Sequence, residues 1–374
     1  MNYQARLEKV WGWMAREGIA LAMFEDFEPR RDSTIRWLTG QPGDALLFLA
    51  ADSRGGGKSL LVPWDVILAK SLAKADAIVP YNDFDRAPLS AIQGAAKMLG
   101  VPAGSKIEIP PATPYPAFVG YAEGLSGFEV VCRDDGAAAL ALDLRTAKDD
   151  GEIAVLRQAA GVTNEIIALL EDSVRDGRIK TEADAALLIE VEARRRGCEG
   201  ASFETLAAGP ERSFGIHAFP AWTDAPFAAR GLSILDFGVR FRGYCTDVTL
   251  TFARDPSPRQ QEMIGLVEKA AEAAKGALAP GSCTQDIAAL VQDLFAKSNE
   301  SMVHGLGHGV GLDVHEYPFV RNRYKTSWNL RPGMVLSIEP GLYDPEQGGC
   351  RLENVFLITA GSSEALTKSR IIRL

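Results

Sequence analysis

Histidine is rare in this sequence, and three of its four histidines fall within one glycine-rich stretch. That stretch, HGLGHGVGLDVHE, contains His304, His308 and His315, and the fourth histidine is His217. Imidazole nitrogens bind metal ions and transfer protons near neutral pH, and glycine lets the backbone approach a ligand closely. The clustering therefore predicts a metal-binding or catalytic site in preference to a solvated, glycine-rich turn.

Four acidic residues interrupt apolar runs that otherwise have the composition of β-strands. They are Asp236 and Asp247 within LSILDFGVRFRGYCTDVTLTF, and Glu339 and Glu353 within RPGMVLSIEPGLYDPEQGGCRLENVFLI. A carboxylate inside a strand is unfavourable unless it is paired or binds a cation. Turn residues separate the two members of each pair, which predicts two hairpins that bring the acids together. The simpler alternative is that the acids lie at strand edges and face water.

Together, these acids and one histidine have the composition of a dinuclear metal site. Four ionised carboxylates carry four negative charges, which two divalent cations would balance, and His308 would add a fifth, neutral ligand. Carboxylates bridge metals about 3.5–4 Å apart in dinuclear hydrolytic sites. Oxygen donors with one nitrogen favour manganese, cobalt, zinc or iron over a thiolate-bound metal, and calcium sites normally lack histidine.

The elements that must position these residues fall into two halves of the sequence. Helical periodicity over residues 3–17, followed by alternating short strands and helices, predicts an α/β domain in the first half. The polar stretch RTAKDD suggests a boundary that gives domains 1–145 and 146–374. In the second half a helix–helix–strand pattern occurs twice, with capping boxes at Thr181 and Ser257. The repeat predicts an α+β domain with pseudo-twofold symmetry and a central site.

Composition and charge exclude several classes of function. A net charge of −9, a pI near 5.2 and the lack of a basic stripe argue against nucleic-acid binding, and nothing suggests a membrane partner. The N-terminal residues lack the apolar core of a signal peptide, and no run approaches a transmembrane span. Five cysteines without a CxxC pair indicate free thiols in a reducing compartment. We therefore expect a cytoplasmic protein.

The motifs around these residues resemble, in order and spacing, the creatinase/aminopeptidase P/prolidase group of metallopeptidases with the pita-bread fold. The strings that carry the resemblance are DFGVRFRGYCTDVTLTF, HGLGHGVGLDVHEYP, SIEPGLY and RLEN. IRWLTG and LRTAKDDGEIAVLRQAA extend it to nearly the whole chain. The resemblance implies an α/β N-terminal domain at 1–145 and a pita-bread catalytic domain at 146–374.

The resemblance also assigns roles to individual residues. It implies five metal ligands: Asp236, Asp247, His308, Glu339 and Glu353. It makes Glu339, His217 and His315 catalytic, with Glu339 passing a proton and the two histidines orienting the amide and stabilising its oxyanion. It places His304 in the proline-side pocket and Arg351 beside the site, where it could hold a carboxylate or a ligand glutamate.

These roles imply a metal-dependent exopeptidase that cleaves the Xaa-Pro bond of dipeptides or of peptide N-termini through a hydroxide bridging two metals. Manganese is the first expectation, with cobalt, zinc or iron as alternatives, and the expected assembly is a homodimer. Other readings are a creatinase- or ectoine-hydrolase-type C–N hydrolase and a non-catalytic peptide-binding relative. All five ligand residues are present here, which favours the peptidase. The segment AGPERSFGIHAF departs from the family pattern in a loop that forms part of the substrate wall.

Overall fold

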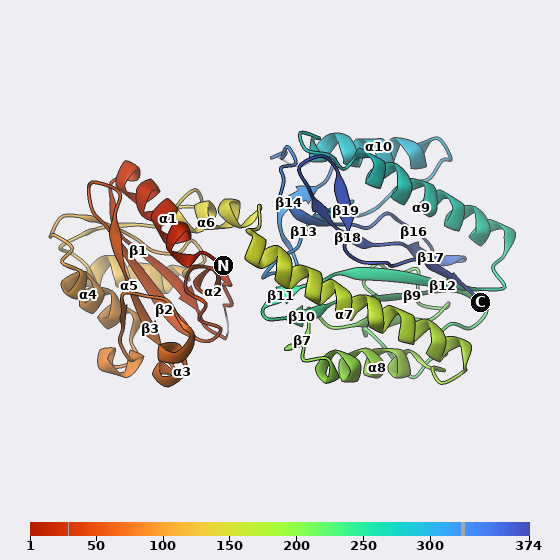
Figure 1. The fold of residues 1–374 in the computed structure, drawn as a ribbon, viewed down its shortest axis with the longest axis horizontal. Helices are drawn as coiled ribbons and strands as arrows, with labels where there is room; N and C mark the ends of the chain where they lie inside the picture. Colours follow the sequence, from red (N-terminus) through yellow and green to blue (C-terminus); the bar gives the residue numbers. More distant parts are fainter. Residues whose placement is uncertain (29, 323–325) are drawn as a thin grey trace. The chain divides into compact units, whose positions relative to one another are not determined.

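The chain folds into two compact units, Met1–Leu144 and Arg145–Leu374. The computed structural model describes residues 1–28, 30–322 and 326–374 (Figure 1). The division lies one residue before the boundary expected from the sequence. Each unit has its own sheet structure and its own hydrophobic core.

The first unit is built on a mixed sheet whose strands run in the order β4-β3-β2-β1-β5-β6 within the described residues. The middle pairs β1–β2 and β2–β3 are antiparallel, and the outer pairs are parallel. The strands are β1 (Ile19–Asp26), β2 (Ala45–Ala51), β3 (Gly57–Pro63), β4 (Ala77–Ile78), β5 (Lys106–Glu108) and β6 (Glu129–Val131). The helices are α1 (Tyr3–Glu17), α2 (Thr34–Thr39), α3 (Val66–Leu72), η1 (Tyr81–Phe84), α4 (Pro88–Leu99), α5 (Tyr115–Gly124) and α6 (Ala137–Arg145). This is the predicted α/β domain.

The second unit contains two helix pairs whose first turns are fixed by capping boxes. The pairs are α7 (Asp150–Arg175) with α8 (Glu182–Arg195), and α9 (Pro258–Ala277) with α10 (Thr284–Ala296). Reciprocal side-chain and backbone hydrogen bonds at Thr181 and Ser257 confirm the predicted caps, and Asp149 caps α7 in the same way.

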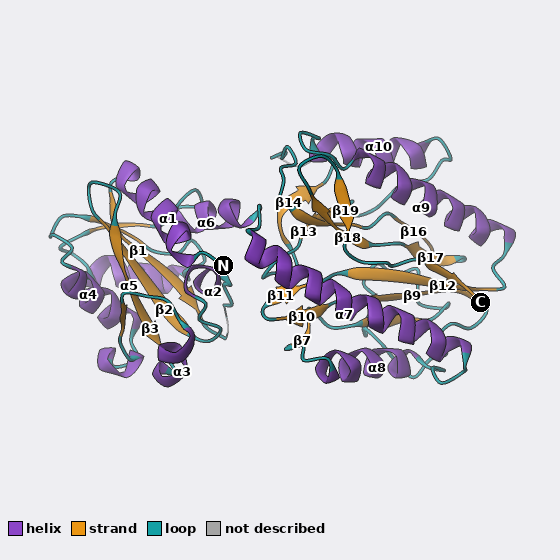
Figure 2. Cartoon of the chain, viewed as in Figure 1, coloured by secondary structure: helices purple, strands orange, loops and turns teal. Residues whose placement is uncertain are grey.

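The strands of the second unit form separate sheets, which lie between α8 on one side and the α9–α10 pair on the other (Figure 2). In the described part of the chain, one sheet has the order β20-β12-β9-β8 and another β14-β13-β15-β18-β19, with smaller sheets β11-β10-β7 and β16-β17. The strands are β7 (Gly200–Ala201), β8 (Leu206–Ala208), β9 (Gly231–Phe237), β10 (Val239–Phe241), β11 (Tyr244–Cys245), β12 (Val248–Arg254), β13 (Gly307–Gly309), β14 (Glu316–Val320), β15 (Val335–Ile338), β16 (Gly341–Asp344), β17 (Gly348–Arg351), β18 (Asn354–Ile358), β19 (Ser363–Ala365) and β20 (Ile371–Arg373).

Each helix pair packs its apolar face on its own sheet. Side chains of α7 and α8 form a core with β9 and β12, while those of α9 and α10 form another with β14, β15 and β18. Figure 1 shows the α9–α10 pair and α8 on opposite sides of the strands. The two layers repeat one arrangement, as the helix–helix–strand pattern predicted.

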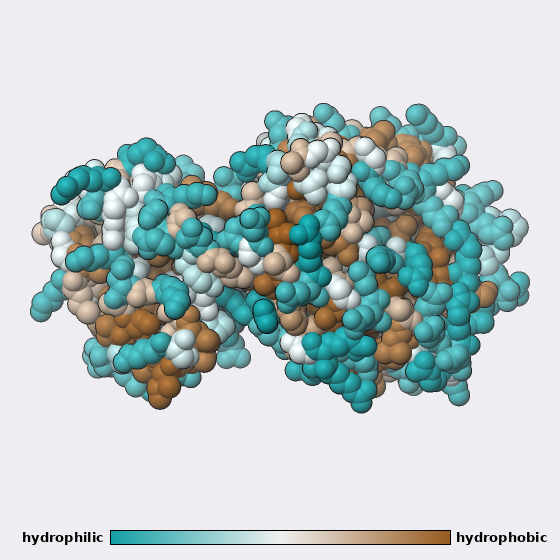
Figure 3. All heavy atoms as spheres, viewed as in Figure 1, coloured by the Kyte–Doolittle hydropathy of each residue, from teal (hydrophilic) through white to brown (hydrophobic). Residues whose placement is uncertain are grey.

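Helix α7 corrects the expectation that no segment approaches a transmembrane span. By length and composition alone it could cross a membrane. Its apolar side chains, among them Ile166, Ile167 and Leu170, are buried in the core shared with β9 and β12. Hydrophilic side chains cover much of the visible face of this unit (Figure 3). Packing against the sheet therefore accounts for the apolar character of α7.

Candidate active site

The first pair of acids is brought together by the pairing of β9 with β12. Asp236 lies in β9 opposite Thr249, and Asp247 directly precedes β12, whose first residue pairs with Phe237. The chain between the two aspartates makes the β10–β11 hairpin. Antiparallel pairing puts both carboxylates at the same end of the strands, as the predicted hairpin required.

The second pair is built in the same way from β15 and β18. Glu339 follows the last residue of β15, and Glu353 precedes the first residue of β18, where Ile338 pairs with Asn354. The β16–β17 hairpin lies between the two glutamates. The two halves meet directly, because the backbone N–H of Glu353 donates to the carbonyl of Thr249 at 3.1 Å. The Thr249 hydroxyl donates to Glu353 Oε2 at 2.9 Å.

The fifth candidate ligand, His308, lies in β13 between two glycines, at positions where the neighbouring backbone leaves no room for a Cβ atom. A Cβ at Gly307 would meet the Ser337 carbonyl oxygen at 2.0 Å, and one at Gly309 would meet the Tyr317 carbonyl oxygen at 2.1 Å. The Nδ1–H of His308 donates to the Gly309 carbonyl at 3.1 Å. Nε2 is therefore the nitrogen with a free lone pair, and it faces Asp247 Oδ2 at 3.5 Å.

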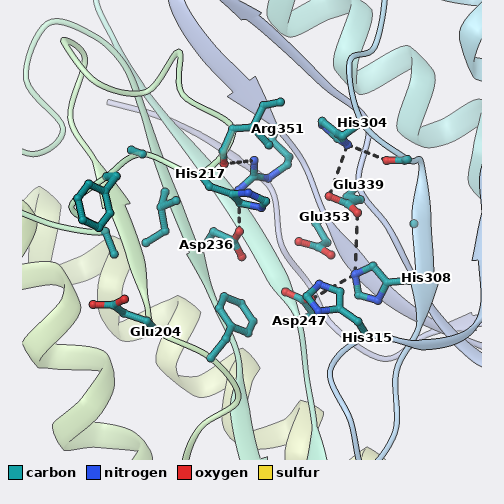
Figure 4. Close-up of a pocket in the computed structure, with 18 of the residues that line it drawn as sticks. Glu204, His217, Asp236, Asp247, His304, His308, His315, Glu339, Arg351 and Glu353 are labelled. Atoms are coloured by element: carbon teal, nitrogen blue, oxygen red, sulfur yellow. Dashed lines mark hydrogen bonds and ion pairs between the residues drawn. The ribbon is translucent and has the colours of Figure 1, made fainter. Parts of the chain in front are cut away.

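Potential ligand atoms converge closely enough to hold metal ions. In the described part of the chain they form three overlapping groups, each with its atoms within 4.8 Å of one another: Asp247, His308 and His315; His308, Glu339 and Glu353; and Asp236, Asp247 and Glu353. Figure 4 shows the acids between His304 and His308 on one side and His217 on the other. The shared members mean that the groups form one continuous centre.

Burial and mutual repulsion make this cluster of carboxylates unfavourable in the absence of positive charge. Burial raises the pKa of Asp247 well above its ordinary range, and the neighbouring Glu353, Asp236 and Glu339 raise it further. Burial and then Glu353 raise the pKa of Glu339 strongly. The pKa of Glu353 rises to about 7, mainly through burial and Asp236.

The cluster has the donor set that a pair of divalent cations requires. Burial also raises the pKa of Asp236, whose Oδ1 is buried and has no hydrogen-bond partner among the described residues. Burial lowers the pKa of His308 to about 3, so its imidazole is neutral at physiological pH and can act as a ligand. Four acids and a neutral nitrogen therefore fit the two metal ions expected from the sequence.

Arg351 supplies a positive charge at the edge of the cluster. From β17 its Nη2 donates to Asp236 Oδ2 at 2.6 Å, Nε to Thr249 Oγ1 at 2.9 Å, and Nη1 to Tyr343 Oη at 2.8 Å. The side chain is 2 % exposed. Arg351 thus holds a carboxylate, as expected, but the candidate ligand that it contacts is the aspartate Asp236 and not a glutamate.

His304 is held by a partner that the sequence did not single out. Its Nδ1–H donates to the Gly305 carbonyl at 2.7 Å, and Nε2 accepts from the Tyr343 hydroxyl at 2.9 Å. Burial lowers the pKa of His304 to about 4 and that of His315 below its ordinary value. Tyr343 thus joins His304 to Arg351. Its only signal was its place in the SIEPGLY motif.

All nine residues expected at the site line one cavity of about 470 Å³. His217 and His315 are exposed to solvent, unlike His308. Ile216, Ala218 and Phe219 of the lining belong to the segment AGPERSFGIHAF, which was expected to form part of the substrate wall. Sequence reasoning missed other residues of the lining, which carried no motif signal: Phe203, Glu204, Leu206, Ala221 and Arg321. The cluster of candidate metal ligands therefore opens into a pocket large enough for a small peptide.

Comparisons with known proteins agree with this geometry. A family model described as Metallopeptidase family M24 matches residues 154–360. An Xaa-Pro dipeptidase of Pyrococcus horikoshii is 32% identical over 230 residues, which are 61% of this chain and 64% of that protein. An uncharacterized peptidase of Methanocaldococcus jannaschii is 30% identical over 231 residues, 61% and 65% of the two chains. The chain thus matches less than two thirds of the length of these relatives.

Solved structures extend the similarity to the whole fold. An Xaa-Pro dipeptidase from Bacillus anthracis superposes with a TM-score of 0.85 at 23% identity, and the superposition covers 100% of both chains. A prolidase from Pyrococcus furiosus has a TM-score of 0.80 at 24% identity, covering 96% of this chain and 99% of that one. These likenesses confirm the expected fold, an α/β N-terminal domain followed by a pita-bread domain.

Proposed function

We propose, because the chain belongs to metallopeptidase family M24, that it is a metal-dependent exopeptidase that hydrolyses the Xaa-Pro bond of dipeptides or peptide N-termini. The observation that carries the proposal is the convergence of five candidate metal ligands and the four histidines of the chain on one cavity. Relatives named Xaa-Pro dipeptidase, about 30% identical, support the proline specificity.

The donor set indicates what each part of the site contributes. Two divalent metal ions, when bound, would lower the pKa of a water molecule and polarise the scissile carbonyl. Asp236, Asp247, His308, Glu339 and Glu353 would hold them, and manganese is our first choice, with cobalt, zinc or iron as alternatives.

Glu339 is the acid best placed to carry a proton. Its side chain is 20% exposed, compared with 14% for Asp236 and 6% for Asp247, so it reaches furthest into the cavity. Its Oε1 lies 3.9 Å from His308 Nε2 and its Oε2 lies 3.8 Å from His304 Nδ1. In our proposal Glu339 takes a proton from the attacking water and delivers it to the leaving nitrogen.

The exposed histidines can bind the reacting amide. The rings of His315 and His308 are tilted by 60° with their centroids 4.4 Å apart, and His217 lies on the other side of the acids (Figure 4). In our proposal both exposed histidines donate hydrogen bonds that orient the carbonyl and stabilise the negative charge that develops on its oxygen. Proline as leaving group supplies a nitrogen with no N–H and a fixed φ, so orientation must come from these contacts.

We also propose that the enzyme acts in the cytoplasm as a homodimer. All five cysteines are free in the structure, which supports a reducing compartment. Sedimentation velocity would test the dimer, and a single species with the mass of one chain would exclude it.

The decisive experiment is hydrolysis of a small panel by metal-stripped protein reloaded with manganese. The panel is Ala-Pro, Leu-Pro, Ala-Pro-Ala, Leu-Leu and creatine. We expect cleavage of Ala-Pro and Leu-Pro and none of Leu-Leu or creatine. Cleavage of Ala-Pro-Ala as well would identify an aminopeptidase, whereas its resistance would identify a dipeptidase. Folded, metal-loaded protein that cleaves no Xaa-Pro bond would refute the proposal.

A further inference from the structure

One carboxylate at the mouth of the cavity does not belong to the cluster of candidate metal ligands. Glu204 lies between β7 and β8, is exposed, and lines the same cavity as the candidate ligands. Figure 4 shows it beyond Asp236, on the opposite side of the acids from His304. The described residues provide no hydrogen-bond or ion-pair partner for its side chain. An ionised carboxylate is thus available to a ligand at this end.

The cavity wall around Glu204 is apolar. Phe203 and Leu206 flank Glu204 in the sequence, and the loop after β8 adds Ile216, Ala218, Phe219 and Ala221 to the lining. Phe219 is 95% exposed, so its ring can cover a side chain that enters from solvent. An acid at the end of an apolar wall suits a side chain with a long aliphatic stem and a cationic tip.

The loop that makes half of this wall is fastened at both ends by Glu182. This carboxylate is fully buried, and its Oε1 accepts from the backbone N–H of Gly209 at 2.7 Å. Its Oε2 accepts from the backbone N–H of Thr223 at 2.8 Å and from the Thr223 hydroxyl at 2.6 Å. Arg212 bonds to Glu182 and to the Pro220 carbonyl, which closes the loop on itself. The wall is therefore preformed in the free protein.

The opposite end of the cavity is closed and has the opposite charge. His304, whose two ring nitrogens bond to Gly305 and Tyr343, is only 15% exposed. Arg321 packs its guanidinium against the position of Gly305, where a Cβ would lie 2.9 Å from Arg321 Nε. A compact ring fits this closed end, and a side chain of variable length needs the open end beside Glu204.

We propose that Glu204 selects substrates in which the residue before proline is lysine or arginine. This inference rests on the proposed function, since it places proline at the His304 end and the preceding side chain along the apolar wall. The carboxylate of Glu204 pairs with the ammonium or guanidinium group at the tip of that side chain. The negative net charge of the chain would also favour the approach of cationic peptides.

The test compares Lys-Pro with norleucyl-Pro, which has the same straight stem without the ammonium group. We expect kcat/KM of the wild-type enzyme to favour Lys-Pro by roughly fivefold, the value of a solvent-accessible ion pair. Glu204→Gln should remove that preference, and Glu204→Lys should reverse it, while norleucyl-Pro is cleaved by all three proteins. Glu211→Gln changes an exposed acid of the loop after β8 that does not line this cavity, and it should keep the preference.

The outcomes separate this inference from the proposed function. Cleavage of both dipeptides with a ratio that Glu204→Gln leaves unchanged would overturn the role of Glu204 and leave the peptidase intact. If no Xaa-Pro dipeptide is cleaved, the role of Glu204 is tested by calorimetry, which measures the binding of lysinamide and norleucinamide to the wild type and to Glu204→Gln. Preferential binding of lysinamide that is lost in the variant would support the cationic subsite, and equal binding of the two amides would refute it.

Discussion

The titration of the acid cluster predicts that ionisation of these acids costs metal-free protein stability as the pH rises through neutrality. Glu353 has a folded-state pKa of about 7 against an ordinary value of 4.5, because burial and Asp236 disfavour its ionised form. A group with a raised folded-state pKa binds protons more tightly in the folded state, so its ionisation costs stability. Asp247 and Glu339, whose pKa values are also raised, act in the same direction.

The histidines act in the opposite direction between pH 6.5 and 8. Burial lowers the folded-state pKa values of His304 and His308 to about 4 and about 3, so near pH 6.5 only the unfolded chain binds protons at these residues. An unfolded histidine is about half protonated at pH 6.5, and loss of these protons returns about 1 kcal/mol for the two residues by pH 8. Over the same range the ionisation of Glu353 alone removes about 1 kcal/mol. The contribution of Glu353 is therefore measured as a difference between the wild type and a variant without this acid.

Urea denaturation of EDTA-treated protein measures this effect directly. Between pH 6.5 and 8 the free energy of unfolding of the wild type should fall by at least about 1 kcal/mol relative to that of Glu353→Gln, which keeps the histidines but lacks the acid. The matched change at exposed Glu346 should follow the wild type at every pH. Manganese should remove the contribution of the acids to the pH dependence of the wild type, since bound cations keep the acids ionised at every pH in the window. A difference between the wild type and Glu353→Gln that stays constant from pH 6.5 to 8 would refute this electrostatic reasoning.

Three further predictions concern single residues of the centre. Asp236→Ala should abolish Xaa-Pro hydrolysis and weaken manganese binding in calorimetry while circular dichroism stays native; turnover by the metal-loaded variant would contradict the dinuclear site. Arg351→Met leaves Asp236 buried without its cation, so metal-free protein should lose about 3–5 kcal/mol in urea denaturation at pH 7.5. Adding Asp236→Asn should restore part of that loss, and a double variant no more stable than Arg351→Met would exclude an ion-pair origin. Gly307→Ala places a Cβ against the Ser337 carbonyl and should lower the free energy of unfolding in urea by about 1–3 kcal/mol. The control, Gly265→Ala in α9, has open space around it and should leave the free energy of unfolding unchanged or raise it.

The sequence revealed the residues whose chemistry conflicts with their surroundings. Acids such as Asp247 and Glu353 within apolar runs require a cation, and the glycines beside His308 are needed because β13 lies against neighbouring backbone. The helix boundaries at Thr181 and Ser257 were predictable because capping is local chemistry. These features could be inferred without knowing which segments meet in space.

The remaining site residues have roles that depend on tertiary contacts. Glu204 is an ordinary glutamate in a short connection, and only the folded chain brings it to the mouth of the cavity. Glu182 follows the predicted cap Thr181 and carries no sequence signal of its own, yet it is buried and binds the loop that carries His217. Its burial depends on where that loop returns more than twenty residues later, and no local pattern encodes this. The same holds for the contact of Tyr343 with His304.

The repeat within the second unit explains the acids, and its asymmetry explains the pocket. Each half runs from strand to acid, through a short hairpin, to a second acid and a second strand. The β10–β11 hairpin faces helix α7, where the Tyr244 hydroxyl donates to Glu152 Oε1 at 2.8 Å. The β16–β17 hairpin instead carries Tyr343 and Arg351 into the site. Duplication can supply a symmetric set of metal ligands, but a substrate has two different ends. Discrimination between those ends must therefore come from elements that the repeat does not share, namely this hairpin and the loop held by Glu182.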